Sequence, residues 1–172
     1  LQIDNEEKGS LIVVDLTVFI TTQGMERLQK RINMLMAERP EVIKAVAIAR
    51  EFGDLSENAE YKAAKERQRT IDSEIDYLRR RSSQLKVIDP SNFPKDAVRF
   101  GTCCKTRDMD TLEEISFRLV GAAELNFWDE EDFQAVSVVS PIGKGLLGKK
   151  PGETAEIKAP MGDRHLEVLE II

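Results

Sequence analysis

The chain has 172 residues, of which 41% are hydrophobic, so a packed core is expected and an intrinsically disordered protein is excluded. No run approaches the ~20 apolar residues of a membrane-spanning helix, and two adjacent cysteines, Cys103 and Cys104, are not a secreted disulfide scaffold, which fits a reducing cytoplasm. The net charge of −6 is uneven, because residues 22–88 hold 14 Lys+Arg against 11 Asp+Glu and residues 89–172 hold 10 against 16. This asymmetry predicts two modules with different partners.

The first 20 residues are predicted to form an N-terminal extension with one short strand. Residues 1–10 are polar and are expected to be loose, whereas residues 11–20 are apolar and β-branched, which favours a strand. The apolar run is interrupted by Asp15 and lacks a basic leader, so a signal peptide is not expected. Thr21 or Thr22 can then cap the N-terminus of a helix.

Residues 21–88 carry the heptad pattern of an antiparallel coiled coil, with one arm over 24–52 and the other over 58–88. The first seam consists of Leu28, Ile32, Leu35, Val42, Val46 and Ala49, with Arg39 in the one polar slot. The second seam consists of Ala64, Gln68, Ile71, Ile75, Leu78, Ser82 and Leu85. Pro40 is expected to kink or strain the first helix, and Gly53 breaks the pattern between the arms.

The two nearly equal arms predict a projecting rod. At a rise of ~1.5 Å per residue each arm would be roughly 45 Å long, which is more than a compact domain of this size needs. Asp89-Pro90 is expected to end the second helix, and residues 89–97 are rich in turn formers and are predicted to be a linker.

Residues 98–172 are predicted to form a small antiparallel β domain with one short helix, so that the whole chain belongs to the α+β class. Turn signals separate short apolar or alternating runs, and a short helix is expected at residues 144–148. The predicted strands are 98–106, 115–120, 135–139, 154–159 and 165–171.

The connection between the two arms is unusually acidic. Four acids fall within ten residues with no base between them, namely Glu51, Asp54, Glu57 and Glu60. Like charges crowded at a turn cost stability unless a cation or a partner compensates. Carboxylates suit Mg²⁺, which takes one or two protein carboxylates together with water and phosphate. Asp54 and Glu57 could supply such a partial shell, but have too few neighbours to hold the ion tightly alone.

A purely structural interpretation of these acids stays open at this point. Asp54 or Ser56 can cap the second helix, and Glu57 and Glu60 can interact favourably with its dipole.

The sequence around the connection resembles the coiled-coil tip of the GreA/GreB family of bacterial transcription elongation factors, and is closest to GreA. The resemblance covers roughly residues 21–172. It is carried by PEVIKAVAIAREFGDLSENAEYKAAKE (40–66), VID (87–89), VRFG (98–101), FRLVG (117–121) and SPIGKGLLGKKPGE (140–153).

The resemblance implies an FKBP-like C-terminal domain over residues 98–172 and a function as a transcript-cleavage factor. Proteins of this family bind at the rim of the secondary channel of RNA polymerase and insert their coiled coil toward its catalytic centre. The polymerase, rather than the factor, then hydrolyses backtracked RNA. The family's two essential acids fall on Asp54 and Glu57, which are expected to complete the shell of a Mg²⁺ shared with polymerase and to orient or deprotonate a water.

Two further sets of contacts follow from the same resemblance. Arg50 and Lys65 match basic residues that contact the RNA 3′ end, although a solvated helix face with ion pairs is the alternative. Ser140, Pro141 and Ile142 match the polymerase-binding side of the C-terminal domain, although they could simply be a loop before a helix with Ile142 packed inside. A monomer without membrane contact is expected.

The segment 122–135 departs from the family pattern. Its Trp128, the only tryptophan, stands beside an acidic run, and could be a core anchor, which we favour, or an exposed partner contact. The only histidine, His165, is expected to have a surface or packing role, so a hydrolase triad has no base.

Two other functions remain open on the sequence. One is a Gre-like protein that occupies the channel and inhibits, although the unaltered GDLSENAEY (53–61) argues for cleavage. The other is an FKBP-like chaperone or prolyl isomerase. A free-standing nuclease is disfavoured, because the tip lacks a complete metal site.

Overall fold

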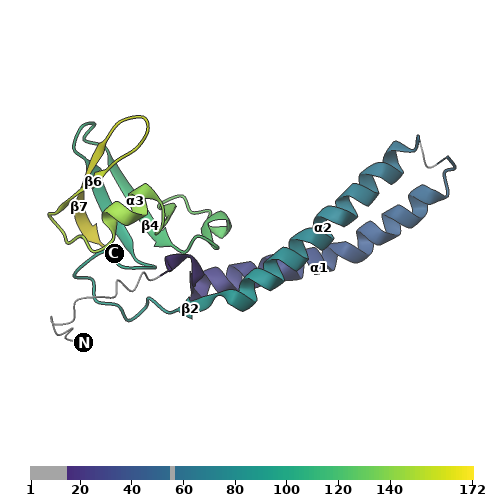
Figure 1. The fold of residues 1–172 in the computed structure, drawn as a ribbon, viewed down its shortest axis with the longest axis horizontal. Helices are drawn as coiled ribbons and strands as arrows, with labels where there is room; N and C mark the ends of the chain where they lie inside the picture. The colour runs from purple at the N-terminus through teal and green to yellow at the C-terminus, as the bar shows by residue number, and fades with distance from the viewer. Residues whose placement is uncertain (1–14, 55–56) are drawn as a thin grey trace, which may run out of the picture.

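In the computed structural model a long helical hairpin projects from a small β domain (Figure 1), and residues 15–54 and 57–172 are described. Helix α1 (Thr22–Arg50) and helix α2 (Ala59–Gln84) run antiparallel. Helix α1 continues through Pro40. No helix in the described ranges is long and apolar enough to cross a membrane. The predicted α+β class is confirmed.

The hairpin is held by the apolar seam that the heptad pattern predicts. The side chains of the two seams bury one another, because both helices turn the same apolar stripe inward. Those buried at the seam include Leu28, Ile32, Leu35, Ile71, Ile75 and Leu78. Three ion pairs cross between the helices beside the seam: Arg31–Glu74 at 2.7 Å, Arg39–Asp72 at 2.6 Å and Arg67–Glu38 at 2.7 Å.

The base of the hairpin is closed by a two-stranded parallel ladder. Strand β1 (Phe19–Thr21) pairs with strand β2 (Lys86–Ile88). The prediction of helix up to residue 88 is therefore wrong for its last residues. The predicted strand 11–20 is also too long, because Leu16–Val18 form a 3₁₀ helix, η1; residues 1–14 lie outside the described residues.

The C-terminal domain is a five-stranded sheet with the order β5-β4-β3-β7-β6. The strands are β3 (Cys103–Asp108), β4 (Glu114–Val120), β5 (Gln134–Ser137), β6 (Thr154–Ile157) and β7 (Arg164–Ile171). The pair β4–β5 is parallel, whereas a wholly antiparallel sheet was expected. Parallel neighbours need a crossover, and the connection 121–133, which contains the 3₁₀ helix η2 (Leu125–Phe127), is long enough to supply it.

Helix α3 (Pro141–Leu146) covers part of this sheet and begins three residues before the predicted helix at 144–148. Its two glycines are explained by close packing. A Cβ on Gly143 would lie 2.0 Å from the Ser137 carbonyl oxygen, and a Cβ on Gly145 would lie 2.9 Å from Ile157 Cγ1. Poor helix formers are therefore present because the backbone approaches the sheet closely.

The first predicted strand of this domain, 98–106, begins only at Cys103. The residues before it form turns, in which Gly101 adopts a φ of +79°. Both cysteines of β3 are free and buried. Burial raises the pKa of the Cys103 thiol and raises the pKa of Cys104 to about 12, so neither is an activated nucleophile.

Candidate functional site

The far end of the hairpin is closed by one side chain that joins the two helices. Asn58 is the N-cap of α2, where its side-chain oxygen accepts from the Tyr61 backbone N–H at 3.0 Å. Its amide Nδ2 also donates to the Ala49 carbonyl oxygen at 2.7 Å, near the end of α1. Gly53 permits the turn between them, because its φ of +101° lies in a region that other residues avoid.

Asp54 and Glu57 lie on this connection, at the end of the hairpin away from the β domain (Figure 1), and both side chains are exposed. The N-cap of α2 is Asn58, so the interpretation of Asp54 as the helix cap is wrong; Ser56, the other candidate cap, lies outside the described residues. Glu60 lies in the first turn of α2, where its charge complements the helix dipole. Two exposed carboxylates therefore stand just before the helix.

The predicted basic residues lie on the two helices that carry the tip. Arg50 is the last residue of α1 and is exposed, and its guanidinium lies 5.8 Å from the centre of the Tyr61 ring. Lys65 is half-buried and lies one helical turn after Tyr61 on α2. Glu66 pairs with Arg69 at 3.9 Å, so a solvated ion-paired face is part of this surface. Both cations are therefore near the acids in the fold, on opposite helices.

The donor chemistry of the tip suits Mg²⁺. Carboxylate oxygens are the ligands that Mg²⁺ prefers, and one or two of them with waters make a usual protein contribution. Within residues 15–54 and 57–172, no group of three or more His, Cys, Asp or Glu side chains is placed to hold a metal ion. An ion bound by Asp54 and Glu57 would need further ligands from another molecule.

Ser140, Pro141 and Ile142 lie at the start of α3, far from the tip. Ser140 is the N-cap, and its Oγ accepts from the Gly143 N–H at 3.1 Å and donates to the Ser137 carbonyl oxygen at 2.6 Å. Pro141 is exposed, while Ile142 packs partly against the domain core, as the structural alternative expects. The three residues also line a mostly apolar groove of about 340 Å³ along the edge strand β5.

Trp128 agrees with neither of its two sequence interpretations. It is half-buried, and the guanidiniums of Arg27 and Arg118 lie 4.2 and 4.6 Å from its ring centre. Its Nε1 donates to Glu124 Oε2 at 3.1 Å. Sequence reasoning missed Glu124, which is fully buried, because it looked like one more member of an acidic segment.

His165 lies near the start of β7, an inner strand of the sheet, with its Nδ1 3.8 Å from an Asp110 carboxylate oxygen. Its side chain is partly exposed and is remote from the acidic tip, on another domain. This position agrees with a surface role.

Comparison with known proteins matches both halves of the chain to one family. The family model described as "Transcription elongation factor, N-terminal" matches residues 18–87, and "Transcription elongation factor, GreA/GreB, C-term" matches residues 93–172. A protein of Rhodospirillum rubrum named transcription elongation factor GreA is 44% identical over 87% of this chain and 93% of its own length. One of the same name from Thermodesulfovibrio yellowstonii is 43% identical over 88% of this chain and 94% of its own length.

Among solved structures, the GreA factor homolog 1 (Gfh1) of Thermus thermophilus is 26% identical, with 90% of this chain and 98% of that chain covered, at a TM-score of 0.40. A GreA/GreB factor from Nitrosomonas europaea is 19% identical over 90% of this chain and 98% of that chain, at a TM-score of 0.37. The two family models together span more than half of the chain, and the curated relatives exceed 40% identity over most of it. This chain therefore belongs to the GreA/GreB family of transcription elongation factors.

Proposed function

We propose that this chain is an elongation factor that inserts its helical hairpin into the secondary channel of RNA polymerase and stimulates the polymerase's own cleavage of backtracked RNA. The observation that carries the proposal is the exposure of Asp54 and Glu57 at the end of a long, thin element away from the β domain. Such an element can reach a site buried inside a larger machine. The chain would supply two carboxylates to that site and would not be an enzyme by itself.

The two carboxylates would have different tasks. Asp54 would complete the shell of a Mg²⁺ held jointly with polymerase, and Glu57 would orient or deprotonate the attacking water. When bound, the ion supplies Lewis-acid activation of the water and of the phosphodiester. Asn58, which follows Glu57, donates to the Ala49 carbonyl oxygen and so joins the start of α2 to the end of α1.

Arg50 and Lys65 would attract the phosphates of the displaced RNA 3′ end. Phosphate contacts need no base readout, so little sequence preference is expected from them. The exposure of Arg50 at the last turn of α1 supports this role, and the stacking of its guanidinium near Tyr61 keeps the charge at the tip.

Ser140, Pro141 and Ile142 would contact polymerase at the rim of the channel. The exposed Pro141 and the apolar groove beside it provide a surface of the kind that protein partners bind. With the groove on the β domain and the acids at the far end of the hairpin, docking and catalysis would use opposite ends of the molecule.

The decisive test replaces both tip acids. In stalled, backtracked complexes of bacterial RNA polymerase with Mg²⁺, the wild-type protein should shorten the RNA, and the Asp54→Ala/Glu57→Ala protein should do so at least ~100-fold more slowly, a loss typical of removing charged catalytic groups. Binding, measured by competition with labelled wild-type protein, should stay within about two-fold, because the groove is unchanged.

The matched control is Glu51→Ala/Glu60→Ala, which removes the same charge from the same tip and should keep cleavage. Cleavage that survives the loss of Asp54 and Glu57 would contradict the mechanism. A wild-type protein that slows RNA extension without shortening RNA would instead be an inhibitor, and turnover of a proline-containing peptide without polymerase would favour an isomerase.

A further inference from the structure

A buried carboxylate joins the hairpin to the β domain. Glu124 precedes η2 and is 0% exposed. Its Oε1 accepts from the backbone N–H groups of Thr21 at 2.9 Å and Gly121 at 2.8 Å. Its Oε2 accepts from the Thr21 hydroxyl at 2.5 Å and from Trp128 Nε1 at 3.1 Å. Four donors from both modules therefore meet on two oxygens.

The same contact is tied directly to the first turn of α1. Thr21 is the N-cap of this helix, and its Oγ1 accepts from the Gly24 N–H at 2.9 Å while it donates to Glu124. The direction of the helix is thus coupled to the carboxylate through one hydroxyl group. A change in the position of Glu124 would disturb the cap and the helix start together.

Two glycines let the modules approach closely enough for this contact. A Cβ on Gly24 would lie 1.8 Å from Glu124 Oε2, and a Cβ on Gly121 would lie 2.2 Å from the Phe19 carbonyl oxygen. Any larger residue at position 24 would force the carboxylate out of its place. The fit between the helix start and the segment 121–128 is therefore specific.

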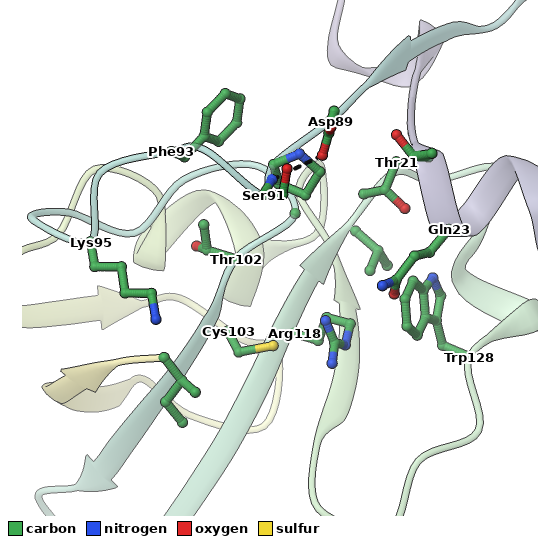
Figure 2. Close-up of a pocket in the computed structure, with 15 residues that line it drawn as sticks. Thr21, Gln23, Asp89, Ser91, Phe93, Lys95, Thr102, Cys103, Arg118 and Trp128 are labelled. Atoms are coloured by element: carbon green, nitrogen blue, oxygen red, sulfur yellow. Dashed lines mark hydrogen bonds between the residues drawn. The ribbon is translucent and has the colours of Figure 1, made fainter.

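Partly buried apolar side chains accompany this polar contact between the modules: Phe127 packs against the hairpin core, Leu16 packs against the sheet core, and the ring centroids of Phe19 and Phe100 lie 6.3 Å apart. The buried apolar residues of the described chain fall into separate clusters, one in the sheet domain and one in the hairpin. Between them lies a cavity of about 250 Å³. As Figure 2 shows, it is bordered by the helix start, the linker and the sheet, including Thr21, Gln23, Asp89, Phe93, Cys103, Arg118 and Trp128. Within the described residues, the hairpin's direction therefore depends on the Glu124 hydrogen bonds together with contacts between partly buried side chains, without a shared buried core.

We propose that Glu124 is a positioning residue that fixes the direction of the hairpin relative to the β domain before polymerase is bound; this inference rests on the proposed function. The hairpin acts as a lever. Helix α1 has 29 residues, so at ~1.5 Å per residue it is about 44 Å long, and a swing of about 10° at its base moves the tip by about 8 Å.

A displacement of this size decides whether the tip enters the channel or collides with its wall. If only a fraction of molecules holds the hairpin in the required direction, the apparent affinity falls by that fraction, while the rate of the bound complex is unchanged. Loss of Glu124 is thus expected to act on binding, whereas loss of the tip acids acts on the rate.

The variant Glu124→Gln has nearly the same shape but cannot accept all four bonds. Whichever way the amide is turned, its NH₂ group faces an N–H donor, either those of Thr21 and Gly121 or that of Trp128. The second variant, Gly24→Ala, displaces the carboxylate from the other side. Glu131→Gln is the matched control, because Glu131 is exposed in the same connection between β4 and β5 as Glu124 and loses the same charge.

The first measurement needs no polymerase. Spin labels on cysteines introduced at Lys44 and Glu156, both exposed and within regular elements, report the distance between hairpin and sheet. The native thiols are buried, so the labels attach at the introduced positions. The wild-type protein and Glu131→Gln should give one narrow distance distribution, and Glu124→Gln and Gly24→Ala should give broad ones, at a temperature where circular dichroism shows all four proteins fully folded.

The second measurement is the dependence of cleavage on factor concentration. For folded Glu124→Gln, the half-saturating concentration should rise about five-fold or more, and the rate at saturation should stay within about two-fold. A narrow distance distribution in both Glu124→Gln and Gly24→Ala, or an unchanged half-saturating concentration for Glu124→Gln, would overturn the inference. A wild-type protein that does not cleave would contradict only the proposed function. The distance distributions test the role of Glu124 independently, because they need no polymerase.

Discussion

At the scale of single residues, the described chain buries few charges, and each of them organises a turn or a junction. Asp108 ends β3 and is 3% exposed. Its Oδ1 accepts from the N–H groups of Asp110 at 2.9 Å and Thr111 at 3.2 Å, and its Oδ2 accepts from Arg164 at 2.9 Å. The hydrogen bond from Arg164, followed by the two backbone bonds, holds the pKa of Asp108 below its usual range. This residue thus builds the β3–β4 turn and ties it to β7.

The replacement Asp108→Asn is therefore expected to destabilise the β domain in a pH-dependent way. The folded-state pKa is lowered from an unfolded value near 4, so the carboxylate contributes stability above about pH 4 and loses it as pH falls through the folded pKa. Thermal unfolding followed by circular dichroism should show a gap in Tm between wild type and variant that is largest above pH 5 and narrows toward pH 2. A gap that stays constant over this range would contradict the assignment.

Single residues also show what a sequence pattern can and cannot reveal. The helix cap at Thr21 was predictable, because a threonine before a periodic apolar run is a local signal. Glu124 was not, because the backbone and hydroxyl groups of Thr21 that bind it lie 103 residues away in the chain. At the tip, the acids were visible in the sequence, but the choice of Asn58 as the cap depended on its second bond, to Ala49.

At the scale of elements, the apolar seam and the ion pairs of the hairpin contribute very different amounts to its stability. Most apolar seam residues predicted from the heptads are buried, although Val42, Ala64 and Leu85 are only partly buried, whereas the side chains of the ion pairs that cross between the helices are 30–44% exposed. Exposed pairs contribute about 0–1 kcal/mol each. The seam could be predicted because burial follows the helical period. Strand β2 could not be predicted, because this three-residue run pairs with β1, which is close in space but precedes α1 in the sequence.

The difference between the stability contributed by the seam and that contributed by the ion pairs can be tested directly. Ile71 is 0% exposed at the centre of the seam, so Ile71→Ala should lower the free energy of unfolding of the hairpin by about 2–5 kcal/mol, since it removes apolar contact and leaves a cavity. Arg39→Ala breaks the exposed pair with Asp72 and should cost at most about 1 kcal/mol. Urea unfolding followed at 222 nm compares them, and equal losses would show that the ion pairs, rather than the seam, hold the helices together.

At the scale of the whole molecule, the two modules have separate buried cores and meet at a junction that combines the Glu124 hydrogen bonds with partly buried apolar side chains. The charge asymmetry and the change from a helical to a strand period predicted two modules, and the equal arms predicted a rod. Neither predicted how the rod is aimed, because that direction is set by Glu124, by two glycines that allow close approach, and by the stacking of Arg27 on Trp128. These contacts join distant segments and leave no periodic trace.

If docking and catalysis use opposite ends of the molecule, the length of the rod must itself be essential. Deleting residues 29–35 and 71–77 removes one heptad from each arm, keeps both seams in register and shortens the rod by about 10 Å. The carboxylates would then stop short of the metal, and because a misplacement of even ~1 Å can cost about 10²-fold, cleavage at saturating protein should fall at least that far. Competition for polymerase should persist, since the groove at Pro141 is intact. The control Arg31→Ala/Glu74→Ala alters the same stretch at full length and should still cleave. A shortened protein that cleaves at the wild-type rate would show that the acids do not act from the end of a rigid rod.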